Sequence, residues 1–319
     1  MIFVPFTGVD HHKKCITFGA GLIANESVES YQWLLQCFVQ TYPKAPSLVL
    51  TDQDPAMLQA VESVFKNSSH RLCMWHIMKK LPAKFPGDFL QSTDFRARLH
   101  KLVWNVFISP TTFEKRWIQL ITEFKLATHV WLRDMYQMRH RWIPAYFRDI
   151  QMCCLMKTTS RCESSNSIFK VNSSPGNTLV QFLFCFDTSI DRQRYNQRLL
   201  EHKSYTTKIP LRTPLLIEKH ALEVYTQEIF LEVQKEIQKG MVGSFITNVE
   251  SNADGLEVFT VHHADKKTII NNSFTVTVDI ANKKASCSCR GFTRIGYLCR
   301  HVFAVYRLRN VQEIPDEYE

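Results

Sequence analysis

The chain has 319 residues, of which 45% are hydrophobic and 22% charged, a composition typical of globular proteins with two or three compact units. Its net charge of +9 favours an acidic partner such as nucleic acid. No apolar run reaches the ~20 residues that a membrane-spanning helix needs, and ten cysteines with three clustered near the C-terminus argue against a disulfide framework and for one metal site in a reducing compartment.

The first segments predict a β-hairpin followed by a helix. Two apolar runs, residues 2–9 and 15–23, flank a polar turn, and such a pattern is typical of paired strands. His11 and His12 lie in that turn. They could bind a metal, but no partner is near them in the sequence, so exposure to solvent is the simpler interpretation. Apolar residues at helical spacing between Tyr31 and Tyr42 predict the helix.

A short buried strand over residues 47–50 comes next and is followed by Asp52. Asp54 and Pro55 are suited to cap and start a second helix. A carboxylate after a buried strand lies where open α/β sheets bind metals and phosphates. Asp52 could also be an ordinary loop residue, and this stretch by itself favours the loop interpretation.

Cys73 and His76 have the spacing of two metal ligands, but a zinc site needs four. A buried strand that runs into a helix explains the same residues.

The pattern of residues 88–150 predicts helices, with one apolar stripe at Phe95, Leu99, Leu102, Val103 and Val106. Residues 71–150 contain 14 Lys and Arg against 6 Asp and Glu, so most of the net charge lies there. This basic region is a candidate DNA contact or an ordinary solvated surface.

Residues 158–166 predict the start of another helix, on which Glu163 shares a face with Asn166 and Lys170. A long helix from about Leu179 follows, and Pro210 and Pro214 mark a boundary. One further helix carries Leu222 and Val233 and is expected to end at Gly240.

A small β module follows Gly240. Residues 274–280 alternate between apolar and polar side chains, which predicts a strand with one buried face. The strand leads to a C-x-C pair and then to C-x-H. The three thiols and one imidazole form a complete tetrahedral zinc set, so the sequence predicts one zinc ion, bound by Cys287, Cys289, Cys299 and His301.

The C-x-C…C-x-H pattern after a β-hairpin resembles the SWIM zinc finger. Four further elements, at residues 6–12, 51–54, 73–76 and 163–166, together resemble the Mutator-like transposase domain. The combination is most similar to the far-red impaired response and far-red elongated hypocotyl 3 related-sequence family of plants, in which that transposase domain has been domesticated. The resemblance covers nearly all of the chain.

The resemblance implies an α/β fold: a partial ribonuclease H-like, transposase-type domain with a helical insertion, and a small β-rich SWIM zinc module. We expect the transposase-like domain over residues 1–210, with the insertion at about 84–156. A helical connector over 211–244 and the SWIM module over 245–319 complete the expected organisation.

In active relatives, the resemblance implies, three carboxylates hold two divalent metals for strand transfer. Asp52 matches the second carboxylate and Glu163 the third. The chain starts after the strand that carries the first, and Asp10 matches a turn position instead. The family's N-terminal DNA-recognition domain is also absent from this sequence. We therefore expect no enzymatic activity, with Asp52 and Glu163 as vestigial candidates.

The function implied is a nuclear, transposase-derived regulator of transcription with a zinc-binding SWIM module. DNA through residues 71–150 and protein partners, in a homo- or heterodimer, are the expected contacts. Two alternatives remain open: an active transposase or nuclease, and a zinc-stabilised interaction module that does not bind DNA.

Overall fold

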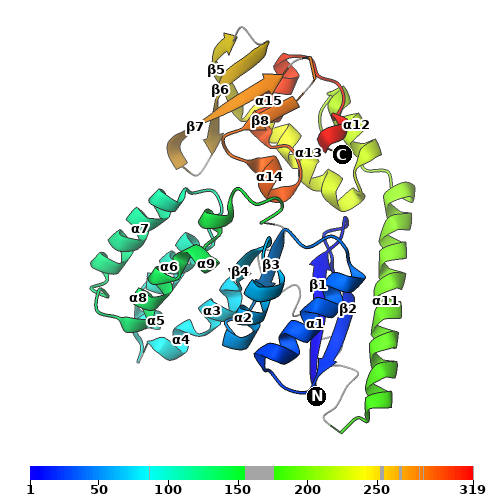
Figure 1. Ribbon diagram of the computed structural model, residues 1–319. Helices are drawn as coiled ribbons and strands as arrows, with labels where there is room; N and C mark the ends of the chain where they lie inside the picture. Colours follow the sequence, from blue (N-terminus) through cyan, green and yellow to red (C-terminus); the bar gives the residue numbers. More distant parts are fainter. Residues whose placement is uncertain are drawn as a thin grey trace. The chain divides into compact units, whose positions relative to one another are not determined.

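The computed structural model describes residues 1–85, 87–154, 176–251, 255–265, 268–279, 281–282 and 284–318 (Figure 1). The chain divides into two compact units, Met1–Gly8 with Cys15–Ser174 and Val9–Lys14 with Pro175–Glu319. The turn of the first hairpin therefore belongs to the second unit. Both units mix helices and strands, which confirms the α/β prediction in outline. Within the described ranges, no helix has the length and apolarity required to cross a bilayer.

Four strands in the first unit form two pairs. The hairpin β1 (Ile2–Val9) and β2 (Cys15–Ile23) has the predicted bounds. Strands β3 (Leu48–Thr51) and β4 (Ser69–Leu72) run parallel. Among the described residues, the two pairs are separate two-stranded sheets.

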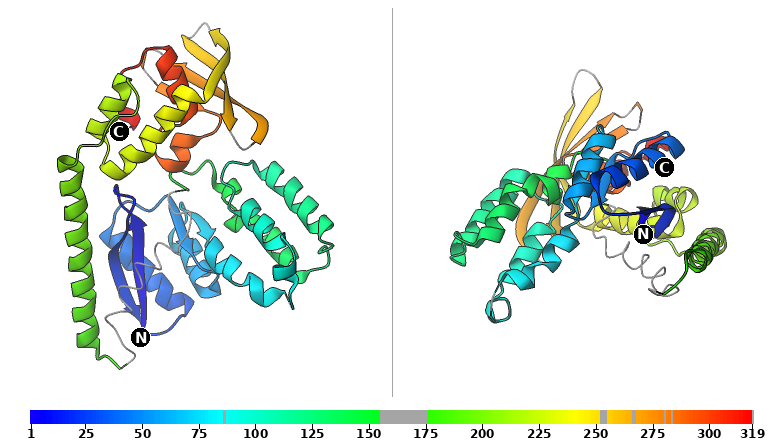
Figure 2. Two further views of the ribbon diagram at one scale, coloured as in Figure 1. Left: turned by 180° about the vertical axis from the view of Figure 1, so that it is seen from behind. Right: turned by 60° about the horizontal axis from the view of Figure 1, so that its bottom comes forward.

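Helices α1 (Val28–Thr41) and α2 (Pro55–Val64) lie on one face of these strands (Figures 1 and 2). Each helix begins at a side-chain cap, because Ser27 accepts a hydrogen bond from the backbone N–H of Ser30 and Asp54 accepts one from Met57. These contacts satisfy N–H groups that the first helical turn leaves free. The two helices share one apolar core. Its buried members are Ile23, Tyr31, Leu34, Leu35, Ala60, Val61 and Phe65.

The remaining elements described in the first unit, up to residue 154, are helices. They are α3 (Met74–Lys79), α4 (Leu81–Lys84), α5 (Phe89–Ser92), α6 (Phe95–Val103), α7 (Pro110–Glu123), α8 (Val130–Gln137), α9 (Arg139–Trp142) and the 3-10 helix η1 (Pro144–Phe147). The predicted stripe from Phe95 to Val106 is buried, which confirms its core role. The helix predicted to carry Glu163 lies outside the described residues.

The second unit begins with three helices, α11 (Leu179–Thr206), α12 (Leu216–Val224) and α13 (Gln227–Val242). The prediction of one helix that ends at Gly240 was wrong. Tyr225 is extended and separates α12 from α13, and α13 continues through Gly240. A Cβ atom at Gly240 would lie 2.7 Å from the carbonyl oxygen of Arg300. This glycine permits two backbones to approach closely instead of ending a helix.

An antiparallel sheet completes the second unit, with its strands in sequence order. The strands are β5 (Ser244–Ser251), β6 (Leu256–Asp265), β7 (Thr268–Asp279) and β8 (Lys284–Cys287), followed by α14 (Gly291–Ile295), α15 (Arg300–Leu308) and the 3-10 helix η2 (Asp316–Tyr318). Val276 and Val278 on β7 are buried, as the alternation predicts. Their core includes Phe230 and Val233 of α13 and Val302 of α15.

Candidate metal centre

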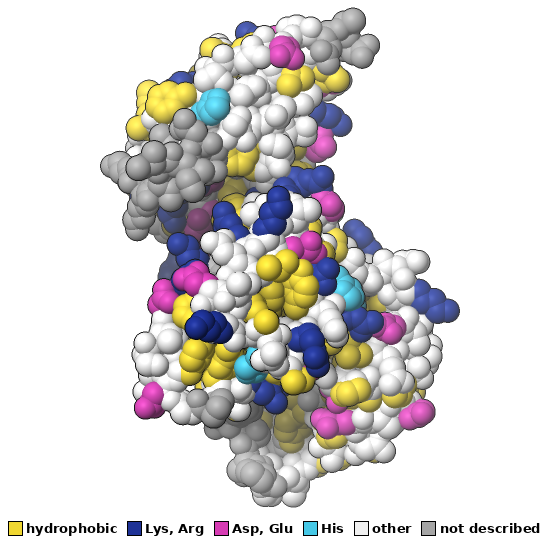
Figure 3. Space-filling model, turned by 90° about the vertical axis from the view of Figure 1, so that its left-hand side faces the viewer, with side chains coloured by type: hydrophobic (Ala, Val, Ile, Leu, Met, Phe, Trp, Pro, Cys, Tyr) yellow, Lys and Arg dark blue, Asp and Glu magenta, His cyan; other side chains and the backbone are white. Residues whose placement is uncertain are grey.

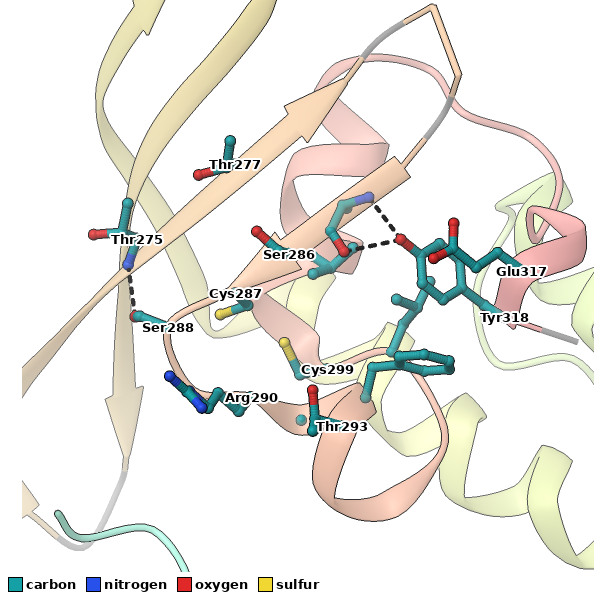
Figure 4. Close-up of a pocket in the computed structure, with 15 residues that line it drawn as sticks. Thr275, Thr277, Ser286, Cys287, Ser288, Arg290, Thr293, Cys299, Glu317 and Tyr318 are labelled. Carbon is teal, nitrogen blue, oxygen red and sulfur yellow. Dashed lines mark hydrogen bonds between the residues drawn. The ribbon is translucent and has the colours of Figure 1, made fainter. Parts of the chain in front are cut away.

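Three elements of the second unit bring the Cys and His side chains of the C-x-C…C-x-H pattern together. Cys287 ends β8, Cys289 follows in the turn, Cys299 caps α15 and His301 lies in its first turn. Their ligand atoms all lie within 4.8 Å of one another. Figure 4 shows Cys287 and Cys299 converging from β8 and the start of α15. The local structure therefore assembles all four side chains that the spacing singled out.

The geometry of this cluster fits a tetrahedral zinc ion. Zinc bonds sulfur at about 2.3 Å and imidazole nitrogen at about 2.0–2.1 Å, so a sulfur and a nitrogen ligand lie about 3.6 Å apart. The Sγ atom of Cys287 and Nδ1 of His301 are 3.6 Å apart. Nδ1 is thus the nitrogen that faces the sulfurs, while the ring stacks on Phe274 with centroids 4.0 Å apart. The donor set and its spacing both match a structural zinc site.

Without a bound metal, the ionisation of each of the three thiols depends on the charge of the other two. Hydrogen bonds from Cys287 and Cys299 hold the pKa of Cys289 far below its usual range. The hydrogen bond with Cys289 raises the pKa of Cys287 to about 12. Hydrogen bonds with Cys287 and Cys289, together with burial, raise the pKa of Cys299 well above normal. Ionisation of one thiol thus suppresses ionisation of the other two. A bound divalent cation would displace their protons.

A salt bridge fixes the start of α15, where two of these side chains lie. Glu236 of α13 accepts hydrogen bonds from the Arg300 guanidinium at 2.6 and 2.8 Å and from its backbone N–H at 3.0 Å. Burial raises the pKa of Glu236, but the hydrogen bonds and charge of Arg300 outweigh burial, so that pKa lies below its ordinary value. Arg300 also contacts Nε2 of His263 at 2.8 Å. Glu236 lies 64 residues before Arg300, and no local pattern in the sequence reveals the pair.

The turn between the C-x-C and C-x-H segments is equally constrained. The buried Arg294 donates to the carbonyl oxygen of Cys289 at 2.6 Å. A Cβ atom at Gly291 would lie 2.7 Å from Cβ of Cys299. Only a glycine leaves room for the two halves of the cluster to meet.

A pocket of about 540 Å³ lies beside the cluster, between β7, β8, α14 and η2. The Tyr318 hydroxyl closes one side, since it donates to the carbonyl oxygen of Ala285 at 2.9 Å and accepts from its N–H at 2.8 Å (Figure 4). The pocket is rich in hydroxyl groups. They belong to Thr275, Thr277, Ser286, Ser288, Thr293 and Tyr318.

The structure places Asp52 at the carboxyl end of β3, where the sequence predicts it. Its side chain is exposed and accepts a hydrogen bond from the backbone N–H of Asp54 at 3.1 Å. Glu163, the other vestigial candidate, lies outside the described residues. Asp10 binds the backbone N–H groups of His12 and Lys14, which is a turn-forming role.

The second candidate pair, Cys73 and His76, lies at the junction of β4 and α3. Cys73 is buried at the N-terminal cap of α3, and His76 is half-buried within that helix. In the described part of the chain, the converging groups of three or more metal-type side chains do not include either residue. Metal binding by this pair stays a prediction.

The basic character of residues 71–150 is partly neutralised by ion pairs. Arg98 pairs with Glu123, and Arg139 pairs with Glu114. Over the face drawn in Figure 3, Lys and Arg side chains are interspersed with hydrophobic and acidic ones. Exposed cations nevertheless recur from α3 to the segment just after α7. They are Lys79, Lys80, Lys84, Arg96, Lys101, Lys115, Arg116 and Lys125.

Comparison with known proteins identifies two domains and a set of homologues. Residues 1–80 match the MULE transposase domain and residues 274–310 match the SWIM zinc finger. Over 99% of its length the chain is 32% identical to Protein FAR1-RELATED SEQUENCE 5 of Arabidopsis thaliana and 29% identical to FAR1-RELATED SEQUENCE 4. Over 98% of its length it is 27% identical to FAR-RED IMPAIRED RESPONSE 1.

These alignments cover 39%, 42% and 37% of the three relatives, so the chain spans about two fifths of their length. The resemblance drawn from the sequence motifs is confirmed. The chain carries a MULE transposase domain and a SWIM zinc finger, and over nearly its whole length it is homologous to FAR-RED IMPAIRED RESPONSE 1 and the FAR1-related sequence proteins of plants.

Proposed function

We propose that the chain belongs to a nuclear, transposase-derived regulator of transcription that binds DNA without cutting it. The observation that carries the proposal is the union of a MULE domain and a SWIM zinc finger in one chain, 99% of which aligns with a FAR1-related protein. DNA contact through the exposed cations of residues 71–150, and dimerisation with a like or related chain, form part of the proposal.

Cys287, Cys289, Cys299 and His301 are the proposed zinc ligands. When bound, zinc would supply no reaction chemistry here, because four protein ligands fill a tetrahedral shell and leave no open position. The role of these residues is to join β8, the turn and α15, which the small module needs for stability. Glu236 and Gly291 support this arrangement by fixing α15 and by leaving room for the cluster.

The finer fold assignment is also a proposal. The order hairpin, helix, strand, helix and parallel strand over β1 to β4 supports a partial ribonuclease H-like domain. We propose its bounds as 1–210 with the helical insertion at about 84–156, a connector at 211–244 and the SWIM module at 245–319.

The proposal of transcriptional regulation is tested by tethering. The full chain, fused to a heterologous DNA-binding domain, is expected to change transcription of a reporter in plant cells. Cys299→Ser should remove the change, whereas Cys37→Ser on α1, outside the cluster, should preserve it. A reporter unaffected by the parent chain, at matched expression, would contradict the regulatory role.

A further inference from the structure

A second group of metal-type side chains lies in the second unit, away from the SWIM cluster. His11 and His12 of the turn between β1 and β2 converge on Glu201 of α11. Nε2 of His11 lies 3.2 Å and Nε2 of His12 lies 2.9 Å from the same carboxylate oxygen, Oε2. The expectation that both histidines face solvent was wrong for His12, which is buried, because Glu201 follows 189 residues after it and meets it only in the folded chain.

This group is held in place before any ligand arrives. Asp10 Oδ1 accepts the backbone N–H groups of His12 and Lys14 at 3.0 and 2.8 Å, and Gln197 on α11 donates to Asp10 Oδ2 at 3.2 Å. The Thr226 hydroxyl donates to the carbonyl oxygen of His11 at 2.6 Å. The turn is therefore anchored to both α11 and the start of α13.

Lysine side chains of the same turn are directed to other carboxylates. Lys13 pairs with Glu232 at 3.6 Å and Lys14 pairs with Glu228 at 3.8 Å. Among the described ion pairs, Glu201 contacts the two imidazoles and no Lys or Arg, and its other polar contact is a hydrogen bond from the neutral Tyr205 hydroxyl. Its negative charge thus remains available to a cation that binds between the imidazoles.

The burial of His12 determines which of its ring nitrogens faces Glu201 and from which side solvent reaches the group. The residue is 1% exposed, and its Nδ1 has no hydrogen-bond partner among the described residues. Nε2 is the nitrogen through which this ring makes its polar contact, and it points at Glu201. The His11 and Glu201 side chains are 64% and 43% exposed, so solvent reaches the group from their side.

The separations are close to those of a tetrahedral metal site. Nitrogen and oxygen ligands at about 2.0–2.2 Å from zinc lie about 3.3–3.4 Å apart. The present distances of 2.9 and 3.2 Å require the ligands to open by only a few tenths of an ångström. Imidazole and carboxylate together suit zinc, cobalt or nickel and disfavour magnesium and calcium, which prefer all-oxygen shells.

We propose that His11, His12 and Glu201 form a second divalent transition-metal site of the His-His-Glu type, with a fourth position open to water. The bound metal would crosslink the turn to α11 and stabilise the second unit by an amount that grows with the free metal concentration. The site is independent of the SWIM cluster and of the proposed regulatory function.

Cobalt titration of the metal-free full chain separates the two sites. Cobalt bound by three thiolates has strong sulfur-to-metal charge-transfer absorption, and cobalt bound by imidazole and carboxylate does not. We expect two equivalents of cobalt per chain by elemental analysis, of which only one contributes charge-transfer absorption. A parent chain that binds a single equivalent would overturn the proposal.

Single substitutions show which residues bind the second equivalent of cobalt. His11→Gln leaves the core intact because the side chain is exposed, and Glu201→Gln removes the shared carboxylate. Both variants should lose the cobalt equivalent that lacks charge-transfer absorption and keep the equivalent that has it. His202→Gln, an exposed neighbour on α11, is the matched control and should retain both. Retention of the second equivalent in Glu201→Gln, or its loss in Cys73→Ser alone, would place that metal elsewhere and overturn the proposal.

Discussion

At the scale of single residues, the zinc cluster shows what spacing can reveal. All four predicted side chains converge, because a C-x-C turn and a C-x-H helix start are short local segments whose geometry the chain itself fixes. Glu236 and Glu201 escaped prediction, since each meets its partner across a sequence gap that only the folded chain closes.

The first prediction concerns Cys299, the most deeply placed thiol on the helix side of the cluster's two segments, where it is buried and caps α15. Cys299→Ser should lose the thiolate-bound zinc and lower the unfolding temperature, because a hydroxyl is a poor zinc ligand and the module gains stability from the metal. Zinc content by mass spectrometry and thermal unfolding provide the measurement, with Cys37→Ser as the control. Full zinc content in Cys299→Ser would sink the ligand assignment.

The Glu236 carboxylate yields a prediction about stability and pH. Glu236→Gln should reduce the free energy of unfolding by about 2 kcal/mol, the magnitude of a partly buried hydrogen bond between charged groups. Because the folded-state pKa of Glu236 is lowered, its stabilisation is full above its unfolded-state pKa and is lost as pH falls through the folded value. Denaturant unfolding at neutral and acid pH should therefore show that the parent and variant converge in acid.

The matched control for this change is Glu232→Gln on the same helix. Glu232 pairs with Lys13 and Lys235 at the surface, where such pairs contribute at most about 1 kcal/mol. An equal loss in both variants, or a difference that persists in acid, would show that the Glu236–Arg300 pair has no special role.

At the scale of elements, periodicity located the first hairpin, the buried helical stripe and strand β7. It misjudged the helix through Gly240, because a glycine signals either a helix end or a close backbone approach, and the sequence does not distinguish them. The break at Tyr225 was missed for a related reason: its apolar side chain fits the helical period although its backbone is extended.

Gly240→Ala tests the close approach of α13 to α15. In an open helix this substitution stabilises by about 1 kcal/mol, but here the added Cβ would lie 2.7 Å from the carbonyl oxygen of Arg300. We expect destabilisation by about 1–3 kcal/mol, typical of overpacking, as measured by denaturant unfolding. Gly176→Ala, where a Cβ meets open space, is the control. A Gly240→Ala variant more stable than the parent would contradict the packing described.

At the scale of the whole molecule, the motifs identified the homologues, because several short patterns in a fixed order are far more specific than any one of them. Charge composition was less informative. The basic region 71–150 folds into helices in which several arginines pair with glutamates, so net charge alone overstates the surface available to DNA. Direct binding must decide between a DNA-associated regulator and an interaction module that does not bind DNA.

Catalysis is the other question at this scale. Two-metal strand transfer needs carboxylates that hold both ions, and Asp52 lies exposed with its oxygen engaged by the N–H of Asp54. Because the Asp52 oxygen is already engaged by the backbone, we expect Asp52 to bind Mg²⁺ weakly, since this ion demands near-ideal octahedral geometry.

One gel assay on supercoiled plasmid addresses both questions, because retardation reports binding and relaxed or linear product reports cleavage. The full chain should retard the plasmid, with retardation that weakens as salt rises because phosphate contacts release counterions. No nicked product should form in Mg²⁺ or Mn²⁺. Nicking by the parent chain that Asp52→Asn and Glu163→Gln both abolish would restore the nuclease interpretation, and absence of retardation at low salt would contradict DNA binding.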